Sequence, residues 1–345
     1  MNAITTTDPE FTPGRELNFL EKFAMNFIID ERDLPFISLI SKMLLTQIPF
    51  AFFLFYTDHI SWWMPIAYLA LCIGYFLGPF ILMLHNTSHR PLFKSKYKFM
   101  NNFIPWCIGI FYGESPETYY AHHLGMHHME NNMENDLSST LKYDRDNVLH
   151  FHHYFFTFFF GGLIQLWNYF TKRQRFKIRN IMTFGEFSFG VLCVVTLYFN
   201  WQASLIVFVI PFIVARYGMM AGNWAQHSFV DAQDPENNYK NSITCINAAY
   251  NQKCFNDGYH IGHHLKDNRH WTDMPRDFRD NIDKYAANDA VVFRKLDFFV
   301  IWFLLMIKNY KALADNFVQL DSNKPRTQEE IIAFLKTRTR RVPTQ

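Results

Sequence analysis

Paired cysteines are missing from this sequence of 345 residues. Its five cysteines form no C-x-x-C pair, which argues against thiolate metal clusters, and they indicate reduced residues instead of a disulfide framework. A large excess of charge is also missing. The net charge of +2 gives no general affinity for nucleic acid. The first sixteen residues lack the basic and then apolar build of a signal peptide, so we expect targeting to rest on the first membrane span.

Long apolar runs are abundant. The chain is 49% hydrophobic and contains 38 phenylalanines, but its mean hydropathy of −0.10 is low for a chain that lies wholly in a membrane. About half of the residues should therefore lie in water. Since a helix of about 20 residues crosses a bilayer, we predict four transmembrane helices. The runs are 34–56, 62–85, 184–200 and 203–222.

The distribution of Lys and Arg predicts how these spans are arranged. The short turns at 57–61 and 200–202 contain neither residue, whereas the segments that flank the two hairpins on the other side are rich in both. Because Lys and Arg accumulate on the cytoplasmic side of spans, we expect two hairpins that enter from the cytoplasm. Buried helices of a soluble protein would not explain this one-sided charge.

The remaining segments should not cross the membrane singly, because a single crossing would put later segments on opposite sides. We expect 99–113 and 149–170 to be interfacial helices, 17–29 to be an amphipathic helix, and 296–308 to be too short to span. The expected fold is an all-α integral membrane protein with a cytoplasmic cap. We divide it into a polar N-terminal segment, a membrane domain, and a helical C-terminal segment with a basic tail, at residues 1–33, 34–285 and 286–345.

Nine histidines fall into four short motifs beside the apolar runs. Residues four apart on a helix lie on one face, so the HxxxH, HxxxHH and HxxHH spacings predict imidazoles that point the same way. Neutral imidazole binds iron, zinc and copper. Nine rings exceed the four ligands of one tetrahedral zinc and suit two metal ions. The histidines are His85, His89, His123, His127, His128, His227, His260, His263 and His264.

Six other histidines fit this pattern less well. His122 adjoins the second motif and is ambiguous. We expect the rest to be surface or interfacial residues, namely His59, His150, His152, His153 and His270.

The set HxxxH, HxxxHH, NxxxH and HxxHH resembles the membrane fatty acid desaturase superfamily of histidine-box, non-haem di-iron enzymes. The resemblance covers roughly Leu34 to His270. Stearoyl-type acyl-CoA desaturases usually have a longer first box and a shorter second one. The spacings here are more similar to acyl-lipid desaturases, alkane hydroxylases and carotenoid-modifying enzymes, which leaves the substrate open.

The resemblance implies two iron ions, with the nine histidines as ligands and Asn223 holding iron through a water. It also implies an O2-dependent oxidation in a membrane, with the site on the cytoplasmic face of the endoplasmic reticulum or of a bacterial inner membrane. The chain has no rubredoxin-like cysteines, no Rossmann glycine fingerprint and no His-Pro-Gly-Gly motif. We therefore expect a separate electron donor of the ferredoxin or cytochrome b5 type.

Further residues are candidates for supporting roles. Aromatic residues near the boxes could line a groove for an alkyl chain or anchor the interface: Tyr119, Tyr120, Trp224 and Trp271. Metal-bound histidines usually donate their second N–H to an oxygen acceptor. The acidic candidates for this role are Asp136, Asp231, Asp257 and Asp267.

Three functions compete at this point. The leading hypothesis is a desaturase of acyl-lipid or acyl-CoA chains. A hydroxylase of acyl chains, alkanes or carotenoids would share the site, and the box spacings do not separate the two. A metal transporter places its ligands near mid-membrane, whereas these boxes lie at the span ends and beyond.

Overall fold

A computed structural model describes residues 4–321 and 324–343. The described chain is mainly helical and divides into two compact units. The unit that we call the apolar unit contains Thr12–Gly125 and Leu166–Tyr217. The polar unit contains the described residues of Met1–Phe11, Met126–Gln165 and Gly218–Gln345. One boundary between the units lies between Phe11 and Thr12, and the other three fall inside η6 (His123–His127), α8 (Val148–Lys172) and α11 (Ile210–Gln226).

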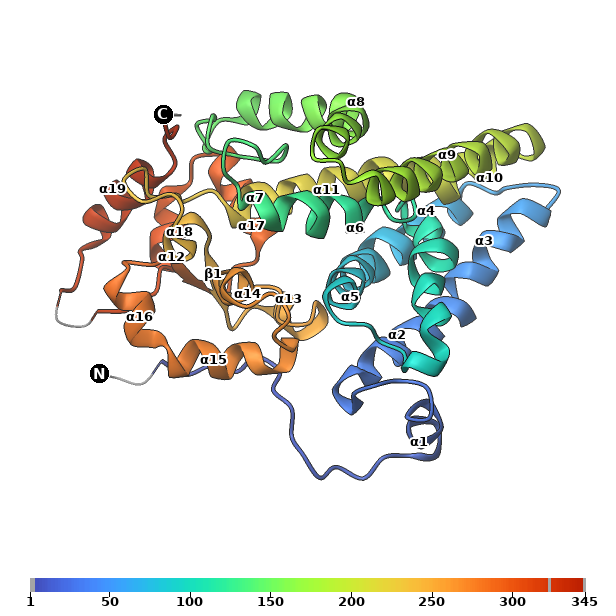
Figure 1. The fold of residues 1–345 in the computed structure, drawn as a ribbon, viewed down its shortest axis with the longest axis horizontal. Helices are drawn as coiled ribbons and strands as arrows, with labels where there is room; N and C mark the ends of the chain where they lie inside the picture. Colours follow the sequence, from blue (N-terminus) through green and yellow to red (C-terminus); the bar gives the residue numbers. More distant parts are fainter. Residues whose placement is uncertain (1–3, 322–323, 344–345) are drawn as a thin grey trace. The chain divides into compact units, whose positions relative to one another are not determined.

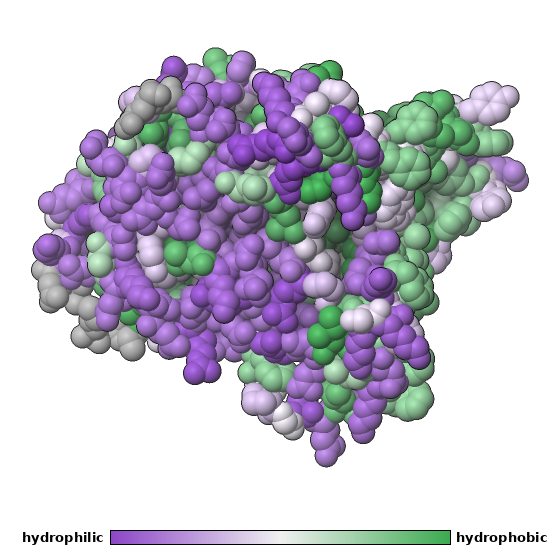
Figure 2. All heavy atoms as spheres, viewed as in Figure 1, coloured by the Kyte–Doolittle hydropathy of each residue, from purple (hydrophilic) through white to green (hydrophobic). Residues whose placement is uncertain are grey.

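Four helical stretches of the described chain are long and apolar enough to cross a membrane, which confirms the four predicted spans. In the Phe176–Phe199 stretch, only 17% of the most apolar window is buried inside the protein, as expected for a helix that faces lipid. Figure 2 shows hydrophobic residues gathered over α3 and α9 of the apolar unit. The stretches are Glu31–Tyr56, Trp63–His89, Phe176–Phe199 and Trp201–Gln226. Whether they form two hairpins inserted from the cytoplasm remains a prediction.

Figure 1 labels the α-helices of the apolar unit. The elements of this unit are α1 (Phe19–Ala24), η1 (Glu31–Asp33), α2 (Leu34–Leu45), α3 (Gln47–Tyr56), α4 (Trp63–Leu69), η2 (Ala70–Phe76), α5 (Leu77–His89), η3 (Ser95–Asn102), η4 (Ile104–Ile108), η5 (Gly109–Tyr112), α6 (Thr118–His122), the start of η6, the end of α8, α9 (Phe176–Phe199), α10 (Trp201–Ser204), η7 (Leu205–Val209) and the start of α11.

Proline acts differently in the first two spans. Thr46 has non-helical angles between α2 and α3, three residues before Pro49. Since proline lacks the N–H that continues a helix, this break is expected. Gly78-Pro79 lies in the first turn of α5, where proline is tolerated, and the second span continues through it to His89.

Two predictions about short helices were inexact. The amphipathic helix expected at 17–29 extends only over α1, where Asn18 and Glu21 form a capping box, and Ile28 pairs instead with Phe93 in an isolated β-bridge. The segment 99–113 is divided among short 3₁₀ and π turns, not one continuous helix. α8 is 25 residues long but is not among the four candidate spans of the described chain, so its interfacial position remains a prediction.

The polar unit combines short helices with a small parallel sheet that the sequence did not indicate. Thr244, Cys245 and Ile246 of β1 (Thr244–Ile246) pair with β2 (Val292–Arg294). The other elements are the end of η6, α7 (His128–Glu130), the first part of α8, the end of α11, α12 (Asn238–Asn241), α13 (Ala249–Lys253), α14 (His260–Leu265), η8 (Trp271–Asp273), α15 (Met274–Asp280), α16 (Ile282–Ala287), α17 (Phe298–Met306), α18 (Tyr310–Asp315) and α19 (Gln328–Arg338).

A buried apolar cluster supports α14, the helix that carries the fourth histidine motif. Tyr259 and Ile261, which flank His260, pack in it with residues of β1, β2, α15 and α16. Its members are Ile246, Tyr259, Ile261, Met274, Phe278, Tyr285, Ala290 and Val292. The alternation of buried apolar residues and histidines therefore directs His260 away from this core.

Candidate metal centre

Four histidines of the polar unit form a group that can hold a metal ion. One ring nitrogen from each of His127, His227, His260 and His264 lies within 4.8 Å of the others. We call this group the quartet. The Nε2 atom of His260 is 3.4 Å from that of His227 and 3.0 Å from that of His264. Nitrogens this close, all from imidazoles, are a plausible donor set for iron, zinc or copper.

Each member of the quartet is placed by its own element. His260 and His264 are four residues apart on α14 and share one face, as the sequence predicted. His227 directly follows α11, and His127 ends η6. The group therefore combines residues that are more than a hundred positions apart in the chain.

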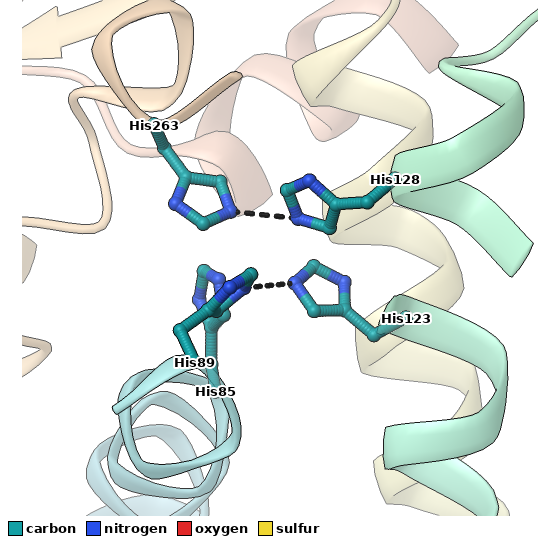
Figure 3. A group of neighbouring side chains, drawn as sticks. All are labelled: His85, His89, His123, His128 and His263. Carbon is teal, nitrogen blue, oxygen red and sulfur yellow. Dashed lines mark hydrogen bonds between the residues drawn. The ribbon is translucent and has the colours of Figure 1, made fainter. Parts of the chain in front are cut away.

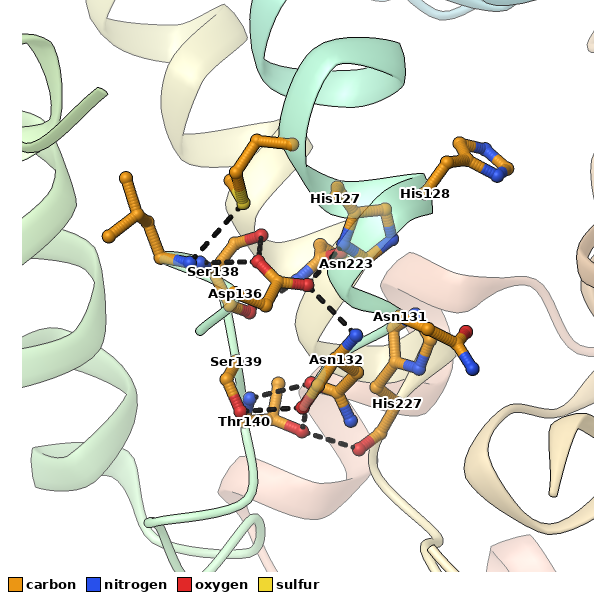
Figure 4. Close-up of polar contacts among 12 residues, drawn as sticks. His127, His128, Asn131, Asn132, Asp136, Ser138, Ser139, Thr140, Asn223 and His227 are labelled. Carbon is orange, nitrogen blue, oxygen red and sulfur yellow. Dashed lines mark hydrogen bonds and ion pairs between the residues drawn. The ribbon is translucent and has the colours of Figure 1, made fainter. Parts of the chain in front are cut away.

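Asp136 orients His127. The Nδ1–H of His127 donates to Oδ2 of Asp136 at 2.6 Å, so its Nε2 is left to face a metal ion. The carboxylate is itself held by the backbone N–H of Asn132 at 2.9 Å, and by the N–H and hydroxyl of Ser138 at 2.8 and 2.7 Å (Figure 4). Both partners are buried. Asp136 is therefore the acidic candidate that accepts the second N–H of a histidine, as the sequence predicted for one or more of the four.

The other acidic candidates have different contacts. Asp231 forms an ion pair with Arg338 at 3.0 Å, and Asp257 accepts a hydrogen bond from the hydroxyl of Tyr250 at 2.9 Å. Asp267 lies in the loop after α14.

His227 is oriented by a backbone carbonyl. Its Nδ1–H donates to the carbonyl oxygen of Asn241 at 2.9 Å. The side chain of Asn241 in turn accepts from Asn132 at 2.8 Å and donates to the carbonyl of Asn131 at 2.7 Å. Asn132 and Asn241 therefore join the supports of His127 and His227, and no spacing pattern in the sequence marked either of them.

Burial favours the neutral form of two histidines of the quartet, His227 and His264. Removal from water, together with the neighbouring imidazole of His127, lowers the pKa of His227 to about 4. Burial also holds the pKa of His264 well below its ordinary value, together with the nearby His260. Since only neutral imidazole offers a lone pair, these side chains are in the ligand form at neutral pH.

A second set of histidines lies in the apolar unit. We call His85, His89 and His123 the trio. The Nε2 atoms of His89 and His123 are 3.1 Å apart (Figure 3), and the rings of His85 and His123 meet edge to face with centroids 4.6 Å apart. His85 and His89 share a face at the end of α5, as their spacing predicted. The ring of Tyr119 stacks on that of His123 at 5.2 Å.

His128 and His263 form a close pair in the polar unit. Their Nε2 atoms are 2.9 Å apart, as Figure 3 also shows. His128 also stacks on His264 of the quartet, with centroids 5.2 Å apart. The pair therefore adjoins the quartet without belonging to it.

The second histidine motif, His123–His128, does not group as its spacing suggested. We expected His123 and His127 to point the same way on an α-helix, but His123–His127 form a π turn. His123 belongs to the trio and His127 to the quartet. A π turn has i→i+5 hydrogen bonds, in place of the i→i+4 bonds of an α-helix. The fourth motif also divides, because His260 and His264 join the quartet and His263 joins His128.

Asn223 lies on α11, one turn before His227. Its amide nitrogen donates to the carbonyl of Ser138 at 3.0 Å and to the hydroxyl of Tyr154 at 2.7 Å. These contacts hold it beside the loop that carries Asp136. A water-mediated contact from Asn223 to iron remains a prediction.

The histidines expected outside the centre belong to neither metal-binding group in the described chain. His150 contacts Arg341 at 3.2 Å, and His270 caps η8. Two of the groove candidates, Trp224 and Trp271, are buried; Trp224 packs among aromatic rings and donates to the carbonyl of Arg145 at 2.9 Å. A substrate groove remains a prediction.

Arg145 is a support that the sequence did not reveal. Its buried guanidinium donates to the carbonyl of Ser228, next to His227, at 3.0 Å and to that of Arg338 at 2.9 Å. It also contacts carbonyls of the loop that follows Asp136, including that of Thr140 at 3.3 Å. Arg145 therefore connects three segments that are far apart in the chain: the loop after Asp136, the residue after His227, and the end of α19. A buried arginine whose partners are backbone carbonyls leaves no residue pattern to search for.

Comparison with protein families supplies the decisive observation. The sequence model of the family described as "Fatty acid desaturase" matches residues 60–295, about two thirds of the chain. The chain belongs to the fatty acid desaturase family. The matched range contains all ten candidate ligands, from His85 to His264. Comparisons with curated proteins and with solved structures found no match.

Membership in the fatty acid desaturase family makes the chain an oxidoreductase of the desaturase or hydroxylase type that acts on lipid. The four candidate spans agree with a membrane protein. The donor set fits the metal centre of this family, since the quartet and the trio each bring several imidazole nitrogens close together.

Proposed function

We propose that this protein is an O2-dependent fatty acyl desaturase that introduces a C=C bond into an acyl-lipid or acyl-CoA chain. The observation that carries the proposal is the quartet with its Asp136 support, found in a member of the desaturase family. In each turnover, two C–H bonds break and O2 is reduced to two water molecules. Two electrons come from a separate ferredoxin or cytochrome b5 type donor, and two protons come from water.

We propose two iron ions, bound by the nine histidines and, through a water, by Asn223. The quartet takes one ion. The trio is the candidate for ligands of the other. Imidazole-bound iron supplies the activation of O2 and the abstraction of hydrogen from an unactivated C–H bond.

The residues of the chain supply orientation and a dry site. The carboxylate of Asp136 and the carbonyl of Asn241 hold the Nδ1 protons of His127 and His227, which fixes the tautomer that presents Nε2. Three of the four histidines of the quartet are buried, and burial holds the pKa of His227 and of His264 below the ordinary value of histidine. Lys and Arg near the span ends support an active site on the cytoplasmic side, in the endoplasmic reticulum or a bacterial inner membrane.

The test is mass spectrometry of total lipids from cells that express the wild type, His263→Ala or His59→Ala. His59 is exposed in the turn between the first two spans, so its variant is the matched control. We expect acyl chains lighter by two hydrogens in the wild type and the control, but not in His263→Ala. A gain of one oxygen would establish the hydroxylase instead. Unchanged lipids with reduced metal uptake would establish a transporter.

A further inference from the structure

A buried polar cluster lies in the apolar unit, outside the histidine groups. It is built on the loop from Gly113 to Thr118, which lies directly against two spans. A Cβ atom on Gly113, whose φ is +77°, would lie 2.3 Å from the backbone nitrogen of Phe212 on α11. A Cβ atom on Gly185 of α9 would lie 1.8 Å from the carbonyl oxygen of Pro116. The two glycines therefore allow the loop backbone to touch both helices.

An ion pair joins the two spans at this loop. Arg216 of α11 donates to Oε1 of Glu186 of α9 at 2.7 Å and to the hydroxyl of Ser115 at 2.8 Å. Ser115 donates in turn to the same oxygen of Glu186 at 2.6 Å. The guanidinium and one carboxylate compensate each other's charge, so the pair needs no second acid.

A second acid is nevertheless present. Glu114 is only 4% exposed, and its Oε1 has no hydrogen-bond partner among the described residues. Burial raises the pKa of Glu114 to about 8; the charge of Arg216 opposes this rise and that of Glu186 adds to it. Glu114 therefore holds a proton at neutral pH. A buried acid without a charge to compensate is costly beside a membrane, which favours a functional role over a structural one.

The cluster is close in the chain to the trio. Thr118, which ends the loop, begins α6, and the next residue, Tyr119, stacks on the ring of His123. Thr118 and His123 are five residues apart, which corresponds to roughly 8 Å along a helix axis. The chain thus passes from the protonated acid to a candidate iron ligand within the apolar unit.

We propose that Glu114, with Ser115, Glu186 and Arg216, is an internal proton source for the reduction of O2. This inference rests on the proposed function. Reduction of O2 to two water molecules takes four protons and four electrons, of which the substrate gives two of each. The external donor supplies the other two electrons. The O–H bond of Glu114 breaks to supply a proton, and the carboxylate regains one from water.

The first experiment does not depend on activity. Infrared spectra of the full-length protein in lipid nanodiscs should show the C=O band of a protonated carboxylic acid at neutral pH. We expect this band to be lost in Glu114→Gln and, in the wild type, as the pH rises through about 8. Glutamine has the shape of a protonated glutamate, so this variant should fold. A band that survives the substitution would overturn the proposal.

The second experiment measures how oxygen use is coupled to product. Iron-loaded protein receives a reduced ferredoxin-type donor and an acyl substrate, and O2, unsaturated product and hydrogen peroxide are quantified. In Glu114→Gln we expect product per O2 to fall at least about tenfold, with the missing oxygen found as peroxide. Glu117→Gln is the matched control, because Glu117 lies in the same loop and accepts from Trp106 at 2.8 Å, which glutamine can still do.

The outcomes separate the two proposals. Equal coupling in the wild type and Glu114→Gln would overturn the role of Glu114 and leave the desaturase intact. No oxidised product from the wild type would overturn the desaturase itself, even if the infrared band behaves as expected.

Discussion

The quartet of the polar unit and the trio of the apolar unit orient imidazoles in different ways. In the trio, His85 and His89 lie on successive turns of one span, so a continuous helix sets the directions of their side chains. In the quartet, His260 and His264 share a face of α14, but His127 and His227 come from other elements and are oriented by hydrogen bonds to Asp136 and Asn241. A long apolar helix supplies rigidity through its backbone, whereas short polar segments need a network of buried hydrogen bonds.

Removing one ligand from each set tests whether both are needed. We expect His264→Ala and His89→Ala each to reduce product formation at least about a hundredfold, because a misplaced metal site loses its near-attack geometry. Each variant should lose about half of the bound iron if the two sets serve different ions. Iron analysis and product assays on purified protein check this. Loss of all iron from both variants would show that the sets are not independent.

Removing a hydrogen-bonded support should affect the quartet selectively. We expect Asp136→Ala to weaken iron binding by about 10- to 100-fold, because His127 loses the acceptor for its Nδ1 proton. Glu134→Gln, an exposed change in the same loop, is the control. Chelator titration of the loaded protein gives the affinities. Equal retention of iron by the two variants would contradict the role of Asp136.

Rigidity of the apolar unit can be tested at two glycines of α9. Gly185→Ala places a Cβ against the carbonyl of Pro116, whereas Gly190→Ala meets nothing within 4 Å. We expect the first change to reduce the free energy of unfolding by about 1–3 kcal/mol through overpacking. The second should raise it by up to about 1 kcal/mol, since alanine favours helix. Thermal unfolding in detergent compares them, and equal midpoints would contradict the close contact.

The last prediction concerns the pH dependence of stability. The folded state raises the pKa of Glu114 from 4.5 to about 8, so it binds a proton that the unfolded chain releases between these values. The stability contributed by this proton is therefore lost as the pH rises from about 4.5 to about 8. Glu114→Gln should remove that decline. We expect the unfolding midpoints of the wild type and the variant to differ by an amount that changes with pH across this range. A constant difference would contradict the raised pKa of Glu114.

The sequence was informative where structure depends on neighbouring residues. The four spans follow from uninterrupted apolar runs, and the shared faces of His85 with His89 and of His260 with His264 follow from helical spacing. The division of the second motif, in which His123 joins the trio and His127 the quartet, was not predictable, because the π turn at His123–His127 has no clear signature in the residues. Asp136 was one of four acidic candidates, and only the folded loop distinguishes it.

Contacts over long sequence separations were missed because they do not depend on neighbouring residues. Arg145 lies between two aspartates in a polar stretch that reads as a solvated loop, and its partners near Ser228 and Arg338 cannot be inferred from its neighbours. Asn241 likewise acts through a fold that brings α12 beside His227. Polar residues of this kind become significant only when burial removes water as their partner.

Arg145 has a consequence for how the protein is made. One of its main partners, the carbonyl of Arg338, is 193 residues later in the chain. At typical synthesis rates of about 5–20 residues per second, the ribosome needs about 10–40 s to reach that partner after Arg145. During this interval Arg145 lacks its hydrogen bond to the carbonyl of Arg338. Stable loading of the quartet with metal should therefore follow translation and not accompany it.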